Sequence, residues 1–171
     1  MRLPVFASCI LLSTNLAFAQ SSEDTPNTLT TVKRSEAPKE VLAAIKCDEV
    51  VDYVTREPFA RGWLWESKCP SNHANEITAQ VFSQTKDGKD AKLIRFPVPK
   101  GAPLEEISNT EVFPANREFN ALFVDPEDKK VCRTEARWIA KDPLKPKLVF
   151  WRETKDCDGK TGWRVLVNTG E

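Results

Sequence analysis

The chain has 171 residues and carries 25 Lys and Arg side chains against 25 Asp and Glu side chains, so its formal net charge is zero. A chain so balanced has no electrostatic attraction to nucleic acid, and none is expected as a partner. No apolar run after Phe18 approaches the roughly 20 residues of a membrane-spanning helix. We therefore expect no membrane insertion after the N-terminal segment is removed, and the length suits one domain with its own core.

The N-terminal segment has the pattern of a secretory signal. Arg2 precedes an uncharged apolar run from Leu3 to Phe18, and Ala17-Phe18-Ala19 supplies small residues at the positions that a signal peptidase reads. The sequence therefore predicts a signal peptide over 1–19, cleavage after Ala19, and a periplasmic protein. Cys9 lies inside the segment that would be removed.

Four cysteines follow the predicted cleavage point: Cys47, Cys69, Cys132 and Cys157. An even number in an exported chain predicts two disulfides, for which three pairings are possible. We favour Cys47–Cys69 and Cys132–Cys157, because each pair joins segments that are close along the chain. A zinc site would need more closely spaced ligands, so neither a metal nor a cofactor is predicted.

Composition divides the remaining chain into two parts. Residues 20–38 are rich in Ser, Thr, Asp, Glu, Asn and Pro, and they offer too little apolar surface to offset the entropy of ordering, so we predict a flexible polar arm. Residues 39–171 are predicted to form one disulfide-bonded, β-rich domain. It begins with a short helix that runs into Cys47, with one apolar stripe made by Val41, Leu42 and Ile45.

The middle of the domain predicts a hairpin. A short strand from Gly62 to Trp65 ends at Cys69, and a second strand covers 77–84 with alternating side chains. Asp87-Gly88 marks a turn, and a third strand is expected over 91–98, where Pro97 and Pro99 end it. Residues 101–120 are expected to be irregular.

The last forty residues predict an antiparallel meander. Three strands are expected over 134–140, 148–153 and 163–167, the first with Thr134, Ala136, Trp138 and Ala140 on one face. Strands joined in sequence by short turns pair antiparallel and leave one face wet. The predicted fold class is therefore mainly β, an α+β arrangement with one short N-terminal helix and an antiparallel, disulfide-stabilised sheet.

Residues with catalytic potential are few. The one histidine, His73, lies in a polar stretch that resembles a solvated loop, and the sequence contains no G-x-S-x-G, H-E-x-x-H or phosphate-binding glycine loop. Asp156-Cys157-Asp158-Gly159 resembles the start of a calcium loop, but Lys160 and Val167 occupy ligand positions, so we interpret it as a turn. The acid pairs Glu105-Glu106 and Glu127-Asp128 are typical of solvated surface. No catalytic residue is predicted, and the chain is not expected to be an enzyme.

Five tryptophans are many for a chain of this length. They fill a small β core, or some of them form a contact surface on a sheet. Trp65 and Trp151 are the candidates for such a binding face, because Phe150 and Trp151 point to opposite sides of one strand.

The chain resembles a bacterial periplasmic family, domain of unknown function 1176 (DUF1176), as a divergent member. The resemblance covers roughly Cys47 to Leu166, and its parts are Cys69 to Phe82, the stretch Gly-Lys-Asp-Ala-Lys-Leu-Ile-Arg-Phe-Pro at 88–97, Leu-Phe-Val at 122–124, Cys132 followed by Arg137-Trp138, and Asp156-Cys157-Asp158-Gly159 followed by Gly162-Trp163. It implies an exported protein and a fold style, but no reaction.

The leading functional hypothesis is a non-catalytic periplasmic module that binds a protein or an envelope component through a sheet face. Two alternatives belong to other classes: an inhibitor of a cell-wall hydrolase such as lysozyme, by analogy of setting, and a hydrolase that uses acidic residues only. No oligomeric state is predicted.

Overall fold

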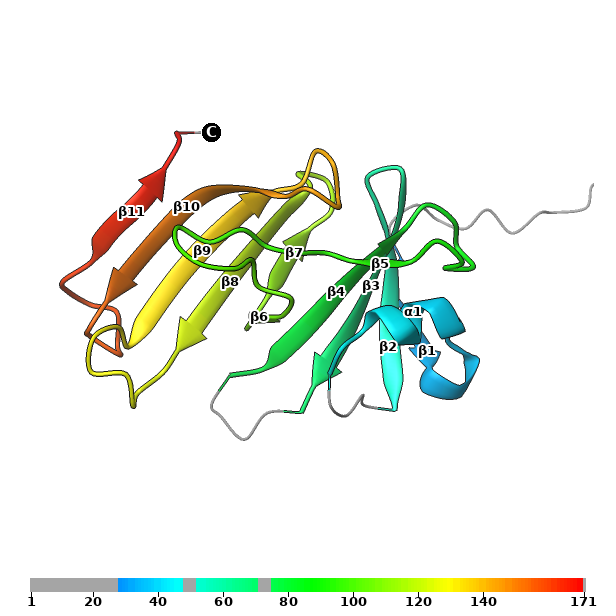
Figure 1. The fold of residues 1–171 in the computed structure, drawn as a ribbon, viewed down its shortest axis with the longest axis horizontal. Helices are drawn as coiled ribbons and strands as arrows, with labels where there is room; N and C mark the ends of the chain where they lie inside the picture. Colours follow the sequence, from blue (N-terminus) through cyan, green and yellow to red (C-terminus); the bar gives the residue numbers. More distant parts are fainter. Residues whose placement is uncertain (1–27, 48–51, 71–74, 171) are drawn as a thin grey trace, which may run out of the picture.

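The computed structural model describes residues 28–47, 52–70 and 75–170. It is mainly β, with two antiparallel sheets that lie edge to edge, one short α-helix and one 3₁₀ turn (Figure 1). This confirms the predicted fold class. The predicted signal peptide over 1–19, with Cys9, lies outside the described residues, as does His73.

The first sheet, called the N-terminal sheet, has the strand order β1-β2-β3-β4-β5, and β6 pairs with β4. The bounds are β1 Thr30–Lys33, β2 Tyr53–Phe59, β3 Gly62–Cys69, β4 Ile77–Ser83, β5 Lys92–Leu93 and β6 Ile107–Ser108. The 3₁₀ turn η1 (Arg34–Glu36) and the helix α1 (Lys39–Ala44) follow β1. Val41 and Ile45 from the predicted stripe are buried, which confirms the apolar face of this helix.

The second sheet, called the C-terminal sheet, has the order β11-β10-β9-β8-β7. Its strands are β7 Glu111–Phe113, β8 Glu118–Val124, β9 Arg133–Ile139, β10 Lys147–Thr154 and β11 Arg164–Asn168. The predicted meander of the last three strands is confirmed. The predicted alternation of β9 is confirmed too, because Ala136 and Trp138 are buried whereas Arg133, Glu135 and Arg137 are only half-buried.

The predicted polar arm over 20–38 needs correction in its second half; residues 20–27 lie outside the described residues. Thr30–Lys33 forms β1, which pairs with β2 from Thr30↔Arg56 to Lys33↔Tyr53. An edge strand gains its hydrogen bonds from backbone groups of one neighbour, so it tolerates polar and exposed side chains. Of the four residues of β1, Val32 alone packs on the core beneath α1, and composition alone therefore missed the strand.

Two further predictions were wrong in their bounds. The strand expected over 91–98 is only Lys92–Leu93. Residues 94–106 are called the strap; Ile94 still donates to the Gln80 carbonyl of β4 at 2.8 Å, and the chain leaves the sheet after it. Within the strap, Phe96 and Leu104 form an isolated bridge with two backbone hydrogen bonds of 2.9 Å. The stretch over 101–120, expected to be irregular, contains β6, β7 and the start of β8.

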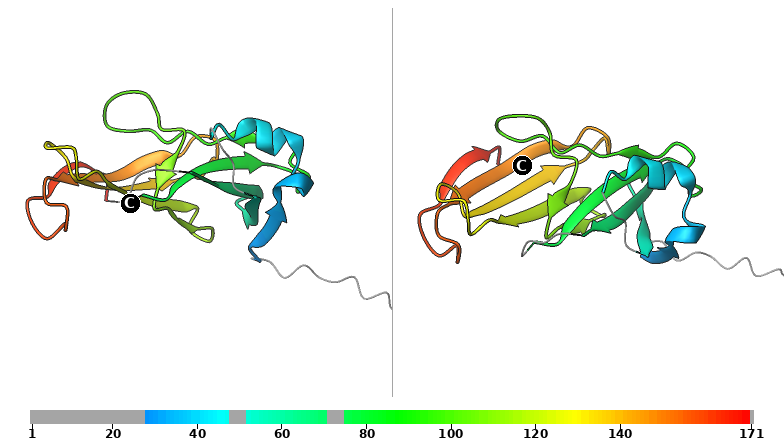
Figure 2. Two further views of the ribbon diagram at one scale, coloured as in Figure 1. Left: turned by 90° about the horizontal axis from the view of Figure 1, so that it is seen from below. Right: turned by 60° about the horizontal axis from the view of Figure 1, so that its bottom comes forward.

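Two apolar cores pack the strap and α1 against the two sheets. The first is centred on Phe96 of the strap, whose ring contacts Phe119 and Trp138 of the C-terminal sheet at centroid distances of 5.1 Å. The second lies between α1 and the N-terminal sheet, around Val41, Trp65 and Val81. Figure 2 shows α1 and the loop of the strap on the same side of the sheets.

Asparagine side chains join the two sheets. Asn75, before β4, donates from Nδ2 to the carbonyl of Val124 on β8 at 2.7 Å, and its Oδ1 accepts from the Val124 N–H at 3.1 Å. Asn109, after β6, donates to the Leu122 carbonyl and to Asn75 Oδ1, both at 2.9 Å. An amide has both a donor and an acceptor, so Asn75 pairs with β8 as a backbone segment would.

Both favoured disulfides are confirmed. Cys47–Cys69 links the end of α1 to the end of β3, and Cys132–Cys157 links the start of β9 to the turn after β10, with Cα–Cα distances of 5.4 and 5.1 Å. Disulfides persist in oxidising compartments, so these two indicate an exported protein.

Candidate binding groove at Trp151

Trp65, the first candidate for the exposed binding face, is buried. Its side chain is 1% exposed, it packs in the core under α1, and Nε1 donates to Ser83 Oγ at 2.8 Å. The guanidinium of Arg56 lies 5.2 Å from the ring centroid and covers it further. The prediction of a surface role for Trp65 was therefore wrong, because the helix that follows β1 covers this side of the sheet.

Trp151, the second candidate, is half-buried and faces a groove. One side of the indole packs on Trp138 and Phe123, with centroid distances of 6.3 and 6.2 Å. Nε1 donates to Glu153 Oε1 at 2.8 Å, which fixes the orientation of the ring. Trp151 thus combines a rigid anchor in the core with a surface that remains accessible.

The groove beside Trp151, called the Trp151 groove, lies between the strap and strands β10 and β11 and has a volume of about 630 Å³. Six of its nine lining residues are apolar, and the full set is Val98, Pro99, Lys100, Ala102, Leu104, Trp151, Glu153, Arg164 and Leu166. Leu166 is 40% exposed on the edge strand. Clefts of this size, apolar with a few polar groups, are typical of ligand sites.

The strap wall is held from below. Trp138 Nε1 donates to the carbonyl of Pro97 at 2.8 Å, and the Phe96–Leu104 bridge closes the base of the loop. The tip turns at Gly101, whose φ of +103° favours glycine. Glu105, near the end of the strap, pairs with Lys46 in the segment after α1 at 3.0 Å and with Arg95 at 2.8 Å. The groove is therefore preformed on its strap side.

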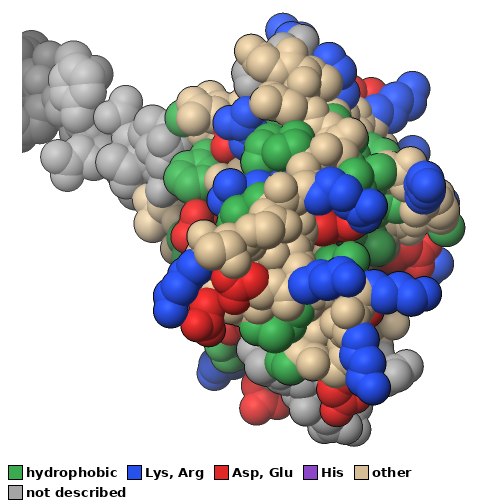
Figure 3. Space-filling view, turned by 90° about the vertical axis from the view of Figure 1, so that its left-hand side faces the viewer, with side chains coloured by type: hydrophobic (Ala, Val, Ile, Leu, Met, Phe, Trp, Pro, Cys, Tyr) green, Lys and Arg blue, Asp and Glu red, His purple; other side chains and the backbone are tan. Residues whose placement is uncertain are grey.

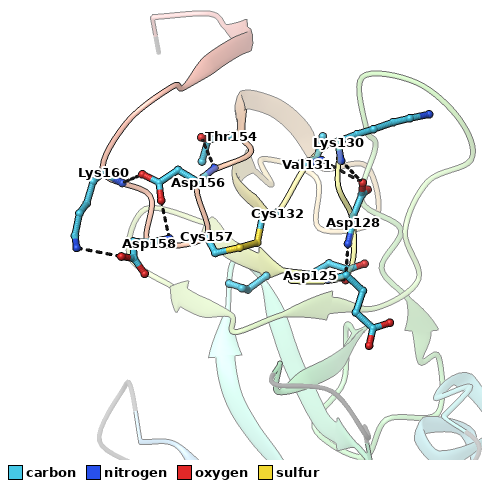
Figure 4. Close-up of a disulfide and its surroundings, with 12 residues drawn as sticks. Asp125, Asp128, Lys130, Val131, Cys132, Thr154, Asp156, Cys157, Asp158 and Lys160 are labelled. Atoms are coloured by element: carbon cyan, nitrogen blue, oxygen red, sulfur yellow. Dashed lines mark hydrogen bonds and ion pairs between the residues drawn. A yellow bond between two sulfur atoms is a disulfide. The ribbon is translucent and has the colours of Figure 1, made fainter.

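The opposite wall is held by the disulfide of the C-terminal sheet. Figure 4 shows Cys132–Cys157 beside the turn that leads from β10 to β11, with Asp156 accepting hydrogen bonds from that turn. Asp156 accepts from the backbone N–H groups of Asp158, Lys160 and Thr161. These bonds confirm the interpretation of 156–159 as a turn, and they fix where β11 starts.

Charge in the groove is unevenly distributed. Glu153 accepts from Trp151 and also from Arg164, whose nitrogen lies 2.9 Å from Oε2, so its carboxylate is paired on both oxygens. Lys100 makes no ion pair within the part of the chain that the structure describes. At the β11 end of the molecule, Lys and Arg side chains are spread among acidic and apolar ones (Figure 3). Of the nine residues that line the groove, Lys100 and Arg164 are cationic and Glu153 is anionic, so the lining carries a net positive charge.

The other face of the C-terminal sheet holds an ion-pair network. Glu135 on β9 contacts Arg133 at 3.2 Å and accepts from Arg152 Nε at 2.8 Å, and the Arg152 guanidinium lies 4.0 Å from the ring centroid of Trp163. A second groove of about 590 Å³ lies on this face beside Phe150 and Glu111. Because the Glu135 carboxylate and the Arg152 guanidinium already satisfy each other, the network is best explained as a stabilising feature.

Several residues that the sequence analysis considered for chemistry make structural contacts instead. All four cysteines after the predicted signal are in disulfides, so Cys47 and Cys69, which lie beside Glu106, offer no thiolate to a metal. Ion pairs with Lys46 and Arg95 lower the pKa of Glu105, and backbone N–H groups lower the pKa of Asp128. Both carboxyls are therefore held ionised rather than poised as acids.

One acidic pair was not predicted from the sequence. Glu57 on β2 and Glu66 on β3 are half-buried, and burial raises the pKa of both carboxyls; Glu66 Oε2 accepts from Gln80 Nε2 at 3.1 Å. Neither lines the Trp151 groove. The sequence analysis also missed Lys100 and Leu104, for which the only signal was the run of prolines that sends the strap out of the sheet.

Comparisons with known proteins add no relative: no family model, no curated protein and no solved structure matches the chain. Within the described residues, no helix has the length and apolar character needed to cross a membrane. The resemblance to DUF1176 remains a prediction.

Proposed function

We propose that the protein is a periplasmic, non-catalytic binding module, exported by its N-terminal signal peptide, that engages a protein or an envelope component through the Trp151 groove. The observation that carries this proposal is the groove itself. It places an anchored tryptophan, an apolar strap and an exposed leucine around one preformed cleft. Rigid aromatic anchors in preformed clefts are typical of recognition sites.

The contacts of the candidate catalytic groups support a binding role rather than a reaction. The disulfides use all four cysteines after the predicted signal, and ion pairs hold Glu105, whereas the half-buried acidic pair Glu57 and Glu66 lies outside the Trp151 groove. Among the described residues, the Trp151 groove is lined by one carboxylate, Glu153, and that group is paired. Acid-only hydrolysis needs two facing carboxyls, so the groove suits a ligand rather than a hydrolytic step.

Two neighbouring residues of β11 provide the test. Leu166 lines the groove, whereas Val165, 53% exposed, does not. Purified wild-type protein and the variants Leu166→Lys and Val165→Lys would each be incubated with envelope extract from the source cells. The fraction of each protein that stays bound to envelope material would then be measured. We expect Leu166→Lys to lose retention and Val165→Lys to keep it. Equal retention by all three variants would refute the groove as the binding surface.

A further inference from the structure

We propose that the Trp151 groove binds an amphipathic anion, a molecule with one apolar chain and one anionic head group. This inference rests on the proposed function, because it assigns a ligand class to the same groove. It follows from three features: the apolar floor, the placement of the cations, and the irregular edge of β11.

The floor suits an apolar chain. Its apolar surface is made by Leu104 of the strap, Trp151 of β10 and Leu166 of β11. A volume of about 630 Å³ lies within the range of roughly 300–1,000 Å³ that small-molecule sites occupy. A flexible chain loses conformational freedom when it binds, and burial of its methylene groups against the apolar surface offsets that loss.

The cations suit an anionic head. Lys100 lies on the strap wall and Arg164 on the β11 wall, so positive groups flank the apolar floor from both sides. The Arg164 guanidinium compensates the charge of the Glu153 carboxylate, so the net positive charge offered to an incoming anion is that of Lys100. A guanidinium has five N–H donors, so Arg164 retains donors for a second anion after it has bound Glu153.

The edge of β11 argues against an extended peptide as the ligand. Trp151 pairs with Val167 and Arg152 pairs with Val165, so Leu166 is an extra residue in β11, a β-bulge. Bulges interrupt the regular spacing of backbone groups and protect an edge from strand addition. A ligand held by side chains is therefore favoured over a strand that would extend the sheet.

The head group has two possible sources, a carboxylate as in a fatty acid or a phosphate as in a single-chain phospholipid. The experiment is a titration of the purified protein with laurate, dodecyl phosphate and the neutral dodecyl maltoside, each below its micelle concentration, followed by calorimetry. Wild type, Lys100→Gln and the control Lys92→Gln are compared. Lys92 is an exposed lysine on β5, outside the groove.

We expect one saturable site for an anionic probe, weakened about tenfold by Lys100→Gln because a charged hydrogen bond is lost, and unchanged by Lys92→Gln. Tighter laurate binding identifies a carboxylate head, and tighter dodecyl phosphate binding a phosphate head. Absence of saturation by either anion, equal binding of the maltoside, or no effect of Lys100→Gln overturns the inference. If these titrations fail while Leu166→Lys still abolishes envelope retention, the ligand class is wrong and the proposed function stands.

Discussion

The seam between the sheets gives a sharp prediction for Asn75→Ala. The substitution removes hydrogen bonds of 2.7 and 3.1 Å to Val124 and one of 2.9 Å from Asn109. Each such bond contributes about 1 kcal/mol net, and half-buried partners left unpaired add a desolvation cost. We therefore expect the free energy of unfolding to fall by about 2–4 kcal/mol, with Asn75→Asp between alanine and wild type because it keeps the acceptor and loses the donor.

Urea denaturation measures this loss, and amide hydrogen exchange of Val124 locates it. Asn116→Ala is the matched control, because Asn116 is exposed in the turn between β7 and β8; exposed substitutions of this kind usually change stability by less than about 0.5 kcal/mol. If Asn75→Ala and Asn116→Ala lose equal stability, or if Val124 exchange is unchanged, side-chain amides do not hold the sheets together.

Three further predictions concern pH, backbone conformation and cross-linking. Burial raises the pKa of Glu66 above 4.5, so its ionised form weakens the fold, and this carboxyl contributes less stability as pH rises through its folded pKa. In denaturation curves, the free energy of unfolding of Glu66→Gln should exceed that of the wild type from about pH 5 to 8 and equal it near pH 4. A reversed trend would contradict this reasoning. Gly159→Ala should destabilise more than Gly170→Ala, because both residues have positive φ (+68° and +69°) but only at Gly159 would a Cβ meet Arg133, at 2.9 Å; equal thermal shifts would show that this contact is unimportant. Replacing Cys132 and Cys157 by alanine should cost about 3.5 kcal/mol in the chain-entropy estimate, and a loss under about 1 kcal/mol by urea denaturation would be inconsistent with it.

The parts of the fold that the sequence predicted are those with a local cause. Trp138 and Ala136 alternate on the buried face of β9, and Val41 and Ile45 lie on the buried side of the helical segment. The repeat of two in a strand and of about 3.6 in a helix depends only on that element's own residues, so the sequence shows it. Both disulfides join segments close along the chain, so adjacency was enough to favour them.

The parts that the sequence missed depend on remote segments. Tyr53–Phe59 has mixed polar and apolar side chains on both faces and includes Pro58, so it shows no strand pattern although it pairs with two neighbours. Trp65 and Trp151 lie in similar strand contexts, but α1 covers the first and the strap leaves the second accessible. The segments that cover each sheet therefore decide which tryptophan is accessible. The groove itself forms because residues 98–104 of the strap return over β10.

Site-specific photo-crosslinking in the source cells shows whether a ligand contacts the Trp151 groove in its native setting. A benzoylphenylalanine at position 166 faces the groove, whereas the same group at position 165, next along β11, does not line it. We expect a discrete crosslinked product at 166 and none at 165. Equal products at both positions, or none at 166, would contradict a binding role for the Trp151 groove.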